Sequence, residues 1–290
     1  MDSRAQAQEL ILADTIQRCA YHLSFENTSF IMSDFLQKMF GFDGRVAVVI
    51  GGTGVLGGEF CSGLAQAGAT VIVAGRNAER GRDRVAKITS LGGKAAFIEV
   101  DAGNRESMQT LLESAVGLQG HVAALVNCAG VNSSTPYFEI KDEEFDKILK
   151  TNLFAAHLGC QVFGKHMIEA GGGAILNIGS VTSCRPLSRV FAYSASKAAV
   201  LSLTQNVARE FAPHGVRVNC LCPGFFPAEQ NRKILDQKRV DDILRHTPMN
   251  RLGDAPELIG AALLLLSPVA GSFITGEAVY VDGGFTAMTI

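Results

Sequence analysis

The stretch Arg45–Gly58 reads RVAVVIGGTGVLGG and decides the fold class. Its apolar run Arg45–Ile50 predicts a buried strand, and the pattern of Glu59–Ala67 predicts a helix directly after the glycines. Glycines let the backbone approach a ligand closely, and a helix N-terminus attracts anions. The stretch therefore predicts a pyrophosphate-binding turn, although a glycine-rich turn on its own is equally compatible with a structural turn.

The same strand–turn–helix pattern continues to the C-terminus. Because most of the apolar runs are continuous rather than alternating, they predict parallel strands that are covered on both faces. Two long helices are expected at Glu143–Ala170 and Ser194–Ala212. The expected architecture is a doubly wound, seven-stranded α/β sheet in one domain. The predicted strands are Arg45–Ile50, Thr70–Gly75, Ala95–Val100, Val122–Asn127, Ala174–Ile178, Arg217–Cys222 and Ala278–Val281.

Composition narrows the functional classes. The 290 residues are 47% hydrophobic, enough for a sizeable core, and the net charge of −2 gives no case for nucleic acid or an anionic membrane. The seven cysteines are scattered without a CxxC pair, which predicts reduced core thiols in a cytoplasmic protein. No cluster of histidine, cysteine and carboxylate residues suggests a metal.

Residues 1–34 precede the repeating pattern. The apolar spacing within Ala5–Leu23 suits a short amphipathic helix, but a weakly ordered extension, or a true start at Met32, is the interpretation we favour. Charged residues interrupt this segment too often for a secretory signal, and no apolar stretch in the chain is long enough to cross a bilayer. We therefore expect an extension over 1–34 and the α/β domain over 35–290.

The second predicted strand bears on the choice of dinucleotide. It ends in Gly75-Arg76-Asn77, without the acidic residue that binds a ribose 2′-hydroxyl in NAD-preferring proteins. Arg76 is suited to the 2′-phosphate of NADP, although a solvated arginine that opens the next helix is the alternative. NADP is therefore the expected cofactor, with NAD possible.

Tyr193 and Lys197 stand four residues apart and share one face of a predicted helix. A free phenol has a pKa of about 10, and a nearby ammonium stabilises the phenolate that a general base needs. Ser180 precedes the pair by 13 residues (193 − 180) and follows the strand Ala174–Ile178, at the edge where parallel sheets bind ligands. The spacing predicts an acid/base group, an electrostatic partner and a polarising hydroxyl.

With these motifs in this order, the sequence resembles the short-chain dehydrogenase/reductase family over about nine-tenths of its length. The resemblance rests on the glycine turn, on the Tyr193/Lys197 pair with Ser180, and on five further motifs. These are Asp101, Asn127-Cys128-Ala129-Gly130, Asn152, Pro223-Gly224 and Val281-Asp282-Gly283-Gly284.

The resemblance implies a Rossmann-type fold and a role for each residue. Tyr193 is expected to be the general acid/base, Ser180 to polarise the carbonyl or hydroxyl, and Lys197 to bind the nicotinamide ribose. Asn152 is expected to anchor a water in the proton relay. The residues expected to hold the cofactor are Gly51, Thr53, Leu56, Gly57, Arg76, Asn77, Asp101, Ala102, Asn127, Ala129, Gly130, Tyr193, Lys197, Pro223 and Gly224.

Three positions depart from the family pattern. Ile50 stands where a threonine is usual, and Val55 replaces the middle glycine of the turn. A threonine that commonly follows Pro-Gly falls on Ala228 or its neighbours. These departures bear on cofactor affinity and choice more than on the type of reaction.

The segments after Pro223 and from Ile243 to Gly253 resemble the mannonate oxidoreductase (fructuronate reductase) branch, which interconverts the secondary alcohol and the ketone of a sugar acid. A hexonate needs cations for its carboxylate and polar groups for its chain. The candidates to border the substrate are Arg185, Arg189, Gln230, Asn231, Arg232 and His246, each of which has a structural alternative.

Two alternatives stay open for the function. One is a 3-oxoacyl thioester reductase, and the other is a dinucleotide-binding redox sensor, which would not need the acid/base groups. Family members usually form dimers or tetramers through helices such as Glu143–Ala170 and Ser194–Ala212, so a homo-oligomer with a small-molecule substrate is expected.

Overall fold

The computed structural model describes residues 34–227 and 237–288. Contacts within the chain separate residues 1–36 from residues 37–290, and the fold described here is that of the larger unit. The predicted helix within Ala5–Leu23 lies outside the described residues, and the predicted domain boundary stays a prediction. The α-helices are α2 (Asp34–Phe40), α3 (Val55–Gln66), α4 (Ala78–Ser90), α5 (Arg105–Gln119), α6 (Asp142–Leu149), α7 (Ala155–Glu169), α8 (Phe191–Phe211), α10 (Gln237–His246) and α11 (Ile259–Leu266).

The described residues form one seven-stranded sheet with the order β3-β2-β1-β4-β5-β6-β7, and each neighbouring pair is parallel. The predicted doubly wound sheet is confirmed, with three strands at their predicted bounds and the others differing by one residue at one end or at both. The strands are β1 (Val46–Ile50), β2 (Thr70–Gly75), β3 (Lys94–Glu99), β4 (Val122–Asn127), β5 (Gly173–Ile178), β6 (Val216–Pro223) and β7 (Ala278–Val281).

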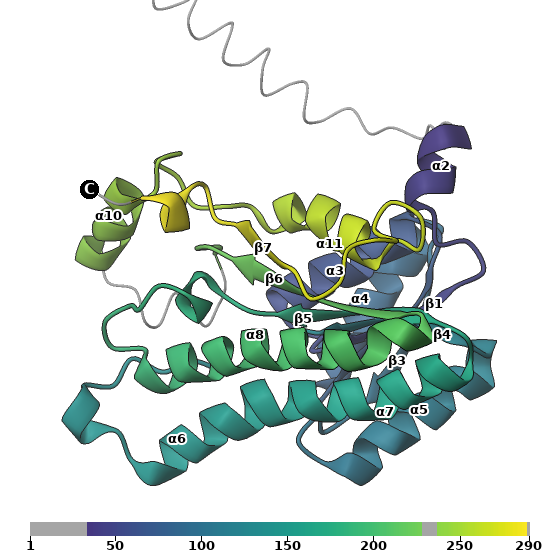
Figure 1. Ribbon diagram of the computed structural model, residues 1–290, viewed down its shortest axis with the longest axis horizontal. Helices are drawn as coiled ribbons and strands as arrows, with labels where there is room; N and C mark the ends of the chain where they lie inside the picture. Colours follow the sequence, from purple (N-terminus) through teal and green to yellow (C-terminus); the bar gives the residue numbers. More distant parts are fainter. Residues whose placement is uncertain (1–33, 228–236, 289–290) are drawn as a thin grey trace, which may run out of the picture. The chain divides into compact units, whose positions relative to one another are not determined.

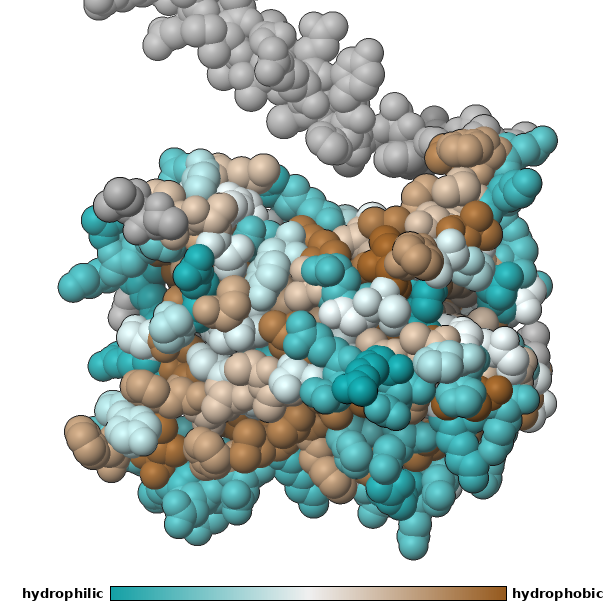
Figure 2. All heavy atoms as spheres, in the orientation of Figure 1, coloured by the Kyte–Doolittle hydropathy of each residue, from teal (hydrophilic) through white to brown (hydrophobic). Residues whose placement is uncertain are grey.

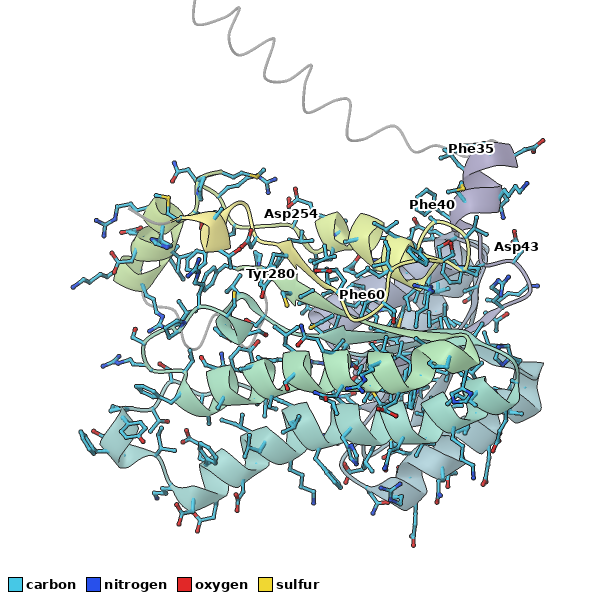
Figure 3. All side chains as sticks on the ribbon, viewed as in Figure 1. Phe35, Phe40, Asp43, Phe60, Asp254 and Tyr280 are labelled. Atoms are coloured by element: carbon cyan, nitrogen blue, oxygen red, sulfur yellow. The ribbon has the colours of Figure 1, made fainter. Side chains whose placement is uncertain are left out.

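Helices cover both faces of the sheet (Figure 1). The helices α3, α4 and α11 pack on one face, and α5, α7 and α8 pack on the other. Strand β1 shows why its sequence is apolar throughout: Ala47 and Val49 join one core while Val46, Val48 and Ile50 join the other. Phe60 of α3 belongs to the first core (Figure 3). Both faces of the strand are therefore removed from water, as expected for a parallel sheet.

The strand order fixes where a ligand binds. The chain moves outward from β1 to β3 and then returns to place β4 on the other side of β1. The loops after β1 and β4 consequently diverge and leave a crevice at the carboxyl ends of these strands.

The helical segment predicted over Glu143–Ala170 is continuous but not uniform. A π-helical turn, Lys150–Phe154, joins α6 to α7 and contains Asn152. Single π turns inside α-helices occur frequently at functional sites, because they change the direction and hydrogen bonding of the backbone locally.

Short 3₁₀ turns follow several of the strands and helices. They are Tyr137–Glu139, Val181–Ser183, Ala212–His214, Ala255–Leu258 and Phe285–Ala287.

Four of the six described cysteines are core thiols, as the composition predicts, and Cys128 is half-buried. Cys61, Cys160, Cys220 and Cys222 are buried and unbridged, whereas Cys184 is exposed on the loop after β5. Within the described ranges, the helices are all too short or too polar to cross a membrane.

Candidate active site

A cleft of about 180 Å³ lies at the carboxyl ends of the central strands. Nine of the residues that the sequence assigned to catalysis or cofactor binding line it. They are Gly51, Leu56, Gly57, Gly130, Ser180, Tyr193, Lys197, Pro223 and Gly224. Residues far apart in the sequence thus meet at the crevice that the strand order creates.

The glycine turn is packed so tightly that side chains are excluded from two of its positions. Gly51 has a φ of +84°, and a Cβ atom on it would lie 2.7 Å from the backbone nitrogen of Ala129. A Cβ atom on Gly57 would lie 2.1 Å from the carbonyl oxygen of Gly51. The turn therefore brings the start of α3 directly to the cleft, with bare backbone facing it.

The departures from the family pattern at this turn fit its geometry. Val55 is the first residue of α3, lines the cleft and is 40% exposed. Among the described non-glycine residues, only Arg189 and Asn250 have a positive φ, so Val55 adopts a backbone conformation open to any L-residue. Ile50 is buried and accepts the backbone N–H of Cys128 through its carbonyl, which joins β1 to the loop after β4.

Tyr193 and Lys197 share one face of α8, as predicted. The Lys197 ammonium lies 5.6 Å from the centroid of the Tyr193 ring and donates a 2.7 Å hydrogen bond to the carbonyl oxygen of Ile178, the last residue of β5. Lys197 is 5% exposed. The cation is thus held between the tyrosine ring and the end of the sheet.

Ser180 is held by its own turn. Its Oγ accepts the backbone N–H of Thr182 at 3.2 Å, and its backbone N–H donates to Ser183 Oγ at 3.2 Å. Ser183 in turn donates to the carbonyl of Lys197 at 2.9 Å. The hydroxyl of Ser180 thus accepts from the protein and keeps its proton for a ligand, while Ser183 fixes the distance between this turn and α8.

Asn152 connects three elements rather than projecting into the cleft. Its Oδ1 accepts the N–H of Val131 at 2.8 Å, and its Nδ2 donates to the Val131 carbonyl and to Ser196 Oγ, each at 3.0 Å. Ser196 donates to the carbonyl of Tyr193 at 2.7 Å. The side chain therefore positions the loop after β4 against the catalytic turn of α8. A role of Asn152 in holding a relay water stays a prediction.

The predicted adenine side of the cofactor site is open and polar. Arg76 is exposed at the end of β2, and Asn77 caps α4 by accepting the backbone N–H of Arg80 at 2.9 Å. Asp101 accepts the N–H of Gly103 at 3.0 Å, which shapes the loop after β3 next to Ala102. Arg80 lines the cleft, and sequence reasoning missed it. Its position in the first turn of α4, directly after Arg76-Asn77, was the available signal.

Besides the residues of the adenine side, three more that were predicted to bind the cofactor do not line the cleft. Asn127 is 6% exposed and donates to Asn177 Oδ1 at 2.8 Å, between neighbouring strands β4 and β5. Thr53 packs against Gly75, and Ala129 contributes its backbone to the close contact with Gly51. These residues shape the site from within the fold, and direct contact with a cofactor stays a prediction.

The residues predicted to border the substrate lie on the loop before α8 and near the C-terminal segment. Arg185 donates to the carbonyl of Thr286 at 3.2 Å, and Arg189 lies exposed with a φ of +66°. The ring of His246 packs on Phe285 at 4.7 Å between centroids, which supports its structural alternative. Phe226 lines the cleft and was not predicted. Gln230, Asn231, Arg232 and Ala228 lie outside the described residues.

A family model described as enoyl-(acyl carrier protein) reductase matches residues 54–286 of this chain. The match spans the cleft and every element around it from α3 onward. The chain belongs to the short-chain dehydrogenase/reductase family. As a member of this family, the protein is an NAD(P)-dependent oxidoreductase that acts on CH–OH groups.

Relatives within the family share most of their length with this chain. The Bacillus subtilis protein named uncharacterized oxidoreductase UxuB is 36% identical over 84% of this chain and 95% of its own. Gluconate 5-dehydrogenase of Gluconobacter oxydans is 33% identical over 86% of this chain and 97% of its own. A crystal structure of gluconate 5-dehydrogenase from Burkholderia cenocepacia in complex with NADP and tartrate is 31% identical, has a TM-score of 0.84, and covers 87% of this chain and 99% of its own.

The cleft fits the dinucleotide that the family uses. The glycine turn leaves a space at Gly51 and Gly57 that a Cβ atom at either position would fill. This space faces the start of α3, where backbone N–H groups point outward. Lys197 and Tyr193 line the same cleft. When bound, the nicotinamide ring supplies or accepts the hydride.

Proposed function

We propose that this enzyme interconverts the secondary alcohol and the ketone of a sugar acid, with NADP preferred to NAD and D-mannonate/D-fructuronate as the candidate pair. The relatives' names support the substrate class: gluconate 5-dehydrogenase, 2-dehydro-3-deoxy-D-gluconate 5-dehydrogenase and D-threitol dehydrogenase. Each of these names denotes a dehydrogenase for a polyhydroxylated chain, and two of the three substrates carry a carboxylate.

The observation that carries the proposal is a set of three arginines at the loop 185–189, immediately before the catalytic turn of α8. Arg185 and Arg189 lie in this loop, and Arg239 of α10 donates to the Ser188 carbonyl at 2.6 Å. Guanidinium groups are the preferred partners of carboxylates. A substrate whose reacting carbon sits at Tyr193 and whose other end is anionic would therefore meet these cations.

Arg76 and Arg80 support the choice of NADP. Both follow β2, where the adenosine ribose of a dinucleotide lies in this fold. The end of β2 carries no carboxylate that would bind the ribose 2′-hydroxyl of NAD. Two arginines at this place would pair with a 2′-phosphate, whereas NAD offers only a hydroxyl.

The proposed proton step uses Tyr193, Ser180 and Lys197. In the oxidation direction, the phenolate oxygen of Tyr193 accepts the proton of the substrate hydroxyl, while the Ser180 hydroxyl donates a hydrogen bond to the same oxygen. Lys197 stabilises the phenolate before the proton is transferred. The carbonyl of Ile178 holds the lysine ammonium, and Ser183 connects the turn of Ser180 to the Lys197 carbonyl. In the reduction direction, Tyr193 returns the proton.

The test is an assay of purified enzyme at the absorbance band of reduced nicotinamide. D-mannonate, D-gluconate and D-threitol are oxidised with NADP and NAD in separate series, and D-fructuronate and a 3-oxoacyl thioester are reduced with NADPH and NADH. We expect turnover of mannonate and fructuronate, with a higher kcat/KM for the NADP couple. Turnover of the thioester alone would replace this proposal with the reductase alternative. Tight NADP binding without any turnover would favour the redox sensor.

We also propose that the protein assembles as a homo-oligomer through the face formed by α7 and α8. Apolar side chains gather over these helices (Figure 2). Phe154, just before α7, is 42% exposed, and Phe191, at the start of α8, is 40% exposed. Light scattering of the full chain tests this directly, since a monomeric mass would contradict it.

A further inference from the structure

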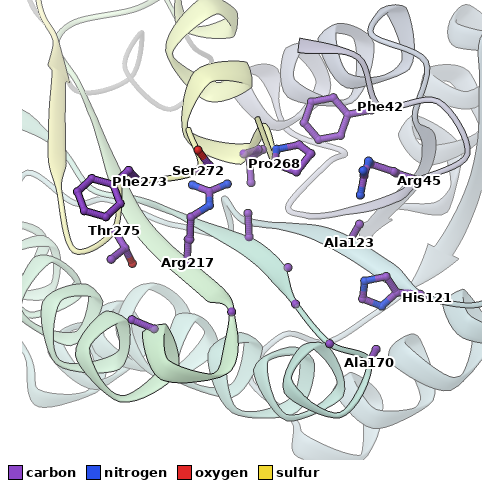
Figure 4. Close-up of a pocket in the computed structure, with 17 residues that line it drawn as sticks. Phe42, Arg45, His121, Ala123, Ala170, Arg217, Pro268, Ser272, Phe273 and Thr275 are labelled. Atoms are coloured by element: carbon purple, nitrogen blue, oxygen red, sulfur yellow. The ribbon is translucent and has the colours of Figure 1, made fainter. Parts of the chain in front are cut away.

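A second cavity, of about 610 Å³, lies at the edge of the sheet opposite the active-site cleft (Figure 4). It is lined by residues that immediately precede strands or begin them, including Arg45 before β1, His121 before β4 and Arg217 in β6. Its volume falls within the range of about 300–1,000 Å³ that is typical of small-molecule sites. The catalytic residues do not border it, because they lie at the other ends of the same strands.

The cavity is lined by cations without carboxylates. Arg45, His121 and Arg217 all contribute to the wall, and none of the described residues that line it is an aspartate or a glutamate. A space of this size with three basic side chains and no acidic one is electrostatically suited to an anion.

Arg217 has a structural task that accounts for its position. Its guanidinium donates to the carbonyl oxygens of Leu265, Ser267 and Ile274, at 2.7, 2.9 and 3.1 Å. These carbonyls belong to the end of α11 and the loop after it. Arg217 therefore fixes the roof of the cavity and leaves recognition to Arg45 and His121.

Arg45 has no such task, whereas the ring of His121 also bonds the backbone of Gly172. The exposed side chain of Arg45 makes no ion pair or hydrogen bond with residues 34–227 or 237–288. Partial burial lowers the pKa of His121, and the nearby basic side chains of His166 and Arg45 lower it further. Nδ1 of His121 lies 3.4 Å from Nε2 of His166, which accepts the backbone N–H of Val122. Three basic side chains thus meet at this corner of the cavity.

We propose that this cavity binds a small metabolite through its oxyanion group, a carboxylate or a phosphate, with Arg45 and His121 as the anchoring residues. Arginine forms paired hydrogen bonds to either group. The rest of the wall is mainly apolar or backbone, including Phe42, Pro268 and Phe273, so the ligand would present a carbon skeleton beside its anionic end. The site is separate from the cleft and has no part in the hydride transfer.

Isothermal titration of the full-length enzyme saturated with NADP tests this proposal, because the cofactor then occupies the phosphate-binding positions of the cleft. Inorganic phosphate and citrate serve as separate probes, so that the two possible oxyanions are distinguished. We expect one equivalent of at least one probe to bind to the wild type. Arg45→Gln and His121→Gln are each expected to weaken this binding at least tenfold, with unchanged kcat. The matched control Arg82→Gln, an exposed arginine on α4, should bind as the wild type does.

Two results would overturn the proposal. One is the absence of binding of both probes to the NADP-saturated wild type. The other is binding that is equally strong in Arg45→Gln and His121→Gln, which would place the anion elsewhere. Thermal unfolding of both variants checks that they are folded, and a loss of stability with unchanged anion binding would assign the two cations to the fold alone.

Discussion

The two edges of the central sheet belong to the same strands, but their polar side chains make different kinds of contact. At the carboxyl edge, polar side chains connect separate elements and converge on one point: Lys197 reaches β5, Ser183 reaches α8, and Asn152 joins the loop after β4 to α8. At the amino edge, Arg217 and His121 contact carbonyl groups or other basic residues around an open cavity.

The direction of the chain explains this difference. In a parallel sheet, each strand delivers its carboxyl end to the start of the next turn or helix, so helix N-termini and their free N–H groups gather at one edge. Helix C-termini gather at the other edge, where basic side chains are favourable. The carboxyl edge is thus suited to hold a dinucleotide and move a proton, and variants at the two edges are expected to affect different properties.

The largest effect is expected from Tyr193→Phe. Loss of the phenol oxygen removes the acid/base group and should lower kcat by roughly 1,000-fold or more. The ring and Lys197 remain, so NADPH binding, followed by its fluorescence, should change little. Loss of binding together with turnover would show that Tyr193 supports the fold of the cleft instead.

Gly57→Ala tests the bare backbone of the glycine turn. The new methyl group would lie 2.1 Å from the Gly51 carbonyl, so the turn must shift, and NADP affinity should fall at least roughly tenfold, about 1.4 kcal/mol. The control is Gly117→Ala in α5, where no atom lies within 4 Å of the added carbon. That variant should keep NADP affinity and gain up to about 1 kcal/mol in the free energy of unfolding. Equal NADP affinity in both variants would show that the turn does not carry the cofactor.

Arg217→Gln moves the comparison to the amino edge. The substitution removes a charged donor from three carbonyl groups and should lower the free energy of unfolding by about 2 kcal/mol, as measured in urea. The kcat of the folded enzyme should stay that of the wild type. A large fall in kcat without loss of stability would connect the amino edge to turnover and contradict the separation of the two edges.

The smallest effect concerns Glu257, whose pKa is held at about 2 by its hydrogen bonds with Arg251 and with the backbone N–H of Asp254. Because the folded-state pKa is depressed, its contribution to stability is present above the unfolded value of about 4.3 and is lost as the pH falls toward 2. Wild type and Glu257→Gln should therefore differ slightly in Tm at neutral pH and converge in acid. Both side chains are exposed, so solvent screens the pair and the difference at neutral pH is small. A difference that grows in acid would contradict this assignment.

The sheet was predictable because its strands are continuous apolar runs. Thr70–Gly75, Val122–Asn127 and Ala278–Val281 have their predicted bounds for this reason. The π turn at Lys150–Phe154 was not predictable, because one extra residue in a helical turn barely disturbs the apolar periodicity on either side.

The site was predictable where motif spacing reflects geometry, as for Tyr193 and Lys197 on one face of α8. The spacing of residues in a motif does not indicate which of their atoms face the cleft. Asn127 stands in a motif for the cofactor, yet its side chain lies between two strands against Asn177. Arg80 and Arg239 escaped prediction because each gains its position from an element that folds next to it, α4 beside the glycine turn and α10 beside the loop 185–189.

The central claim is that the carboxyl edge transfers a hydride between NADP and a sugar acid. The most direct test is reduction of D-fructuronate with NADPH that carries deuterium at C4 of the nicotinamide, with mass spectrometry of the product. We predict that the deuterium of one of the two C4 positions appears on the new CH–OH carbon of mannonate, and that Tyr193→Phe suppresses its transfer. A product without deuterium from either C4 position, or no reduction by an enzyme shown to bind NADPH, would contradict the account.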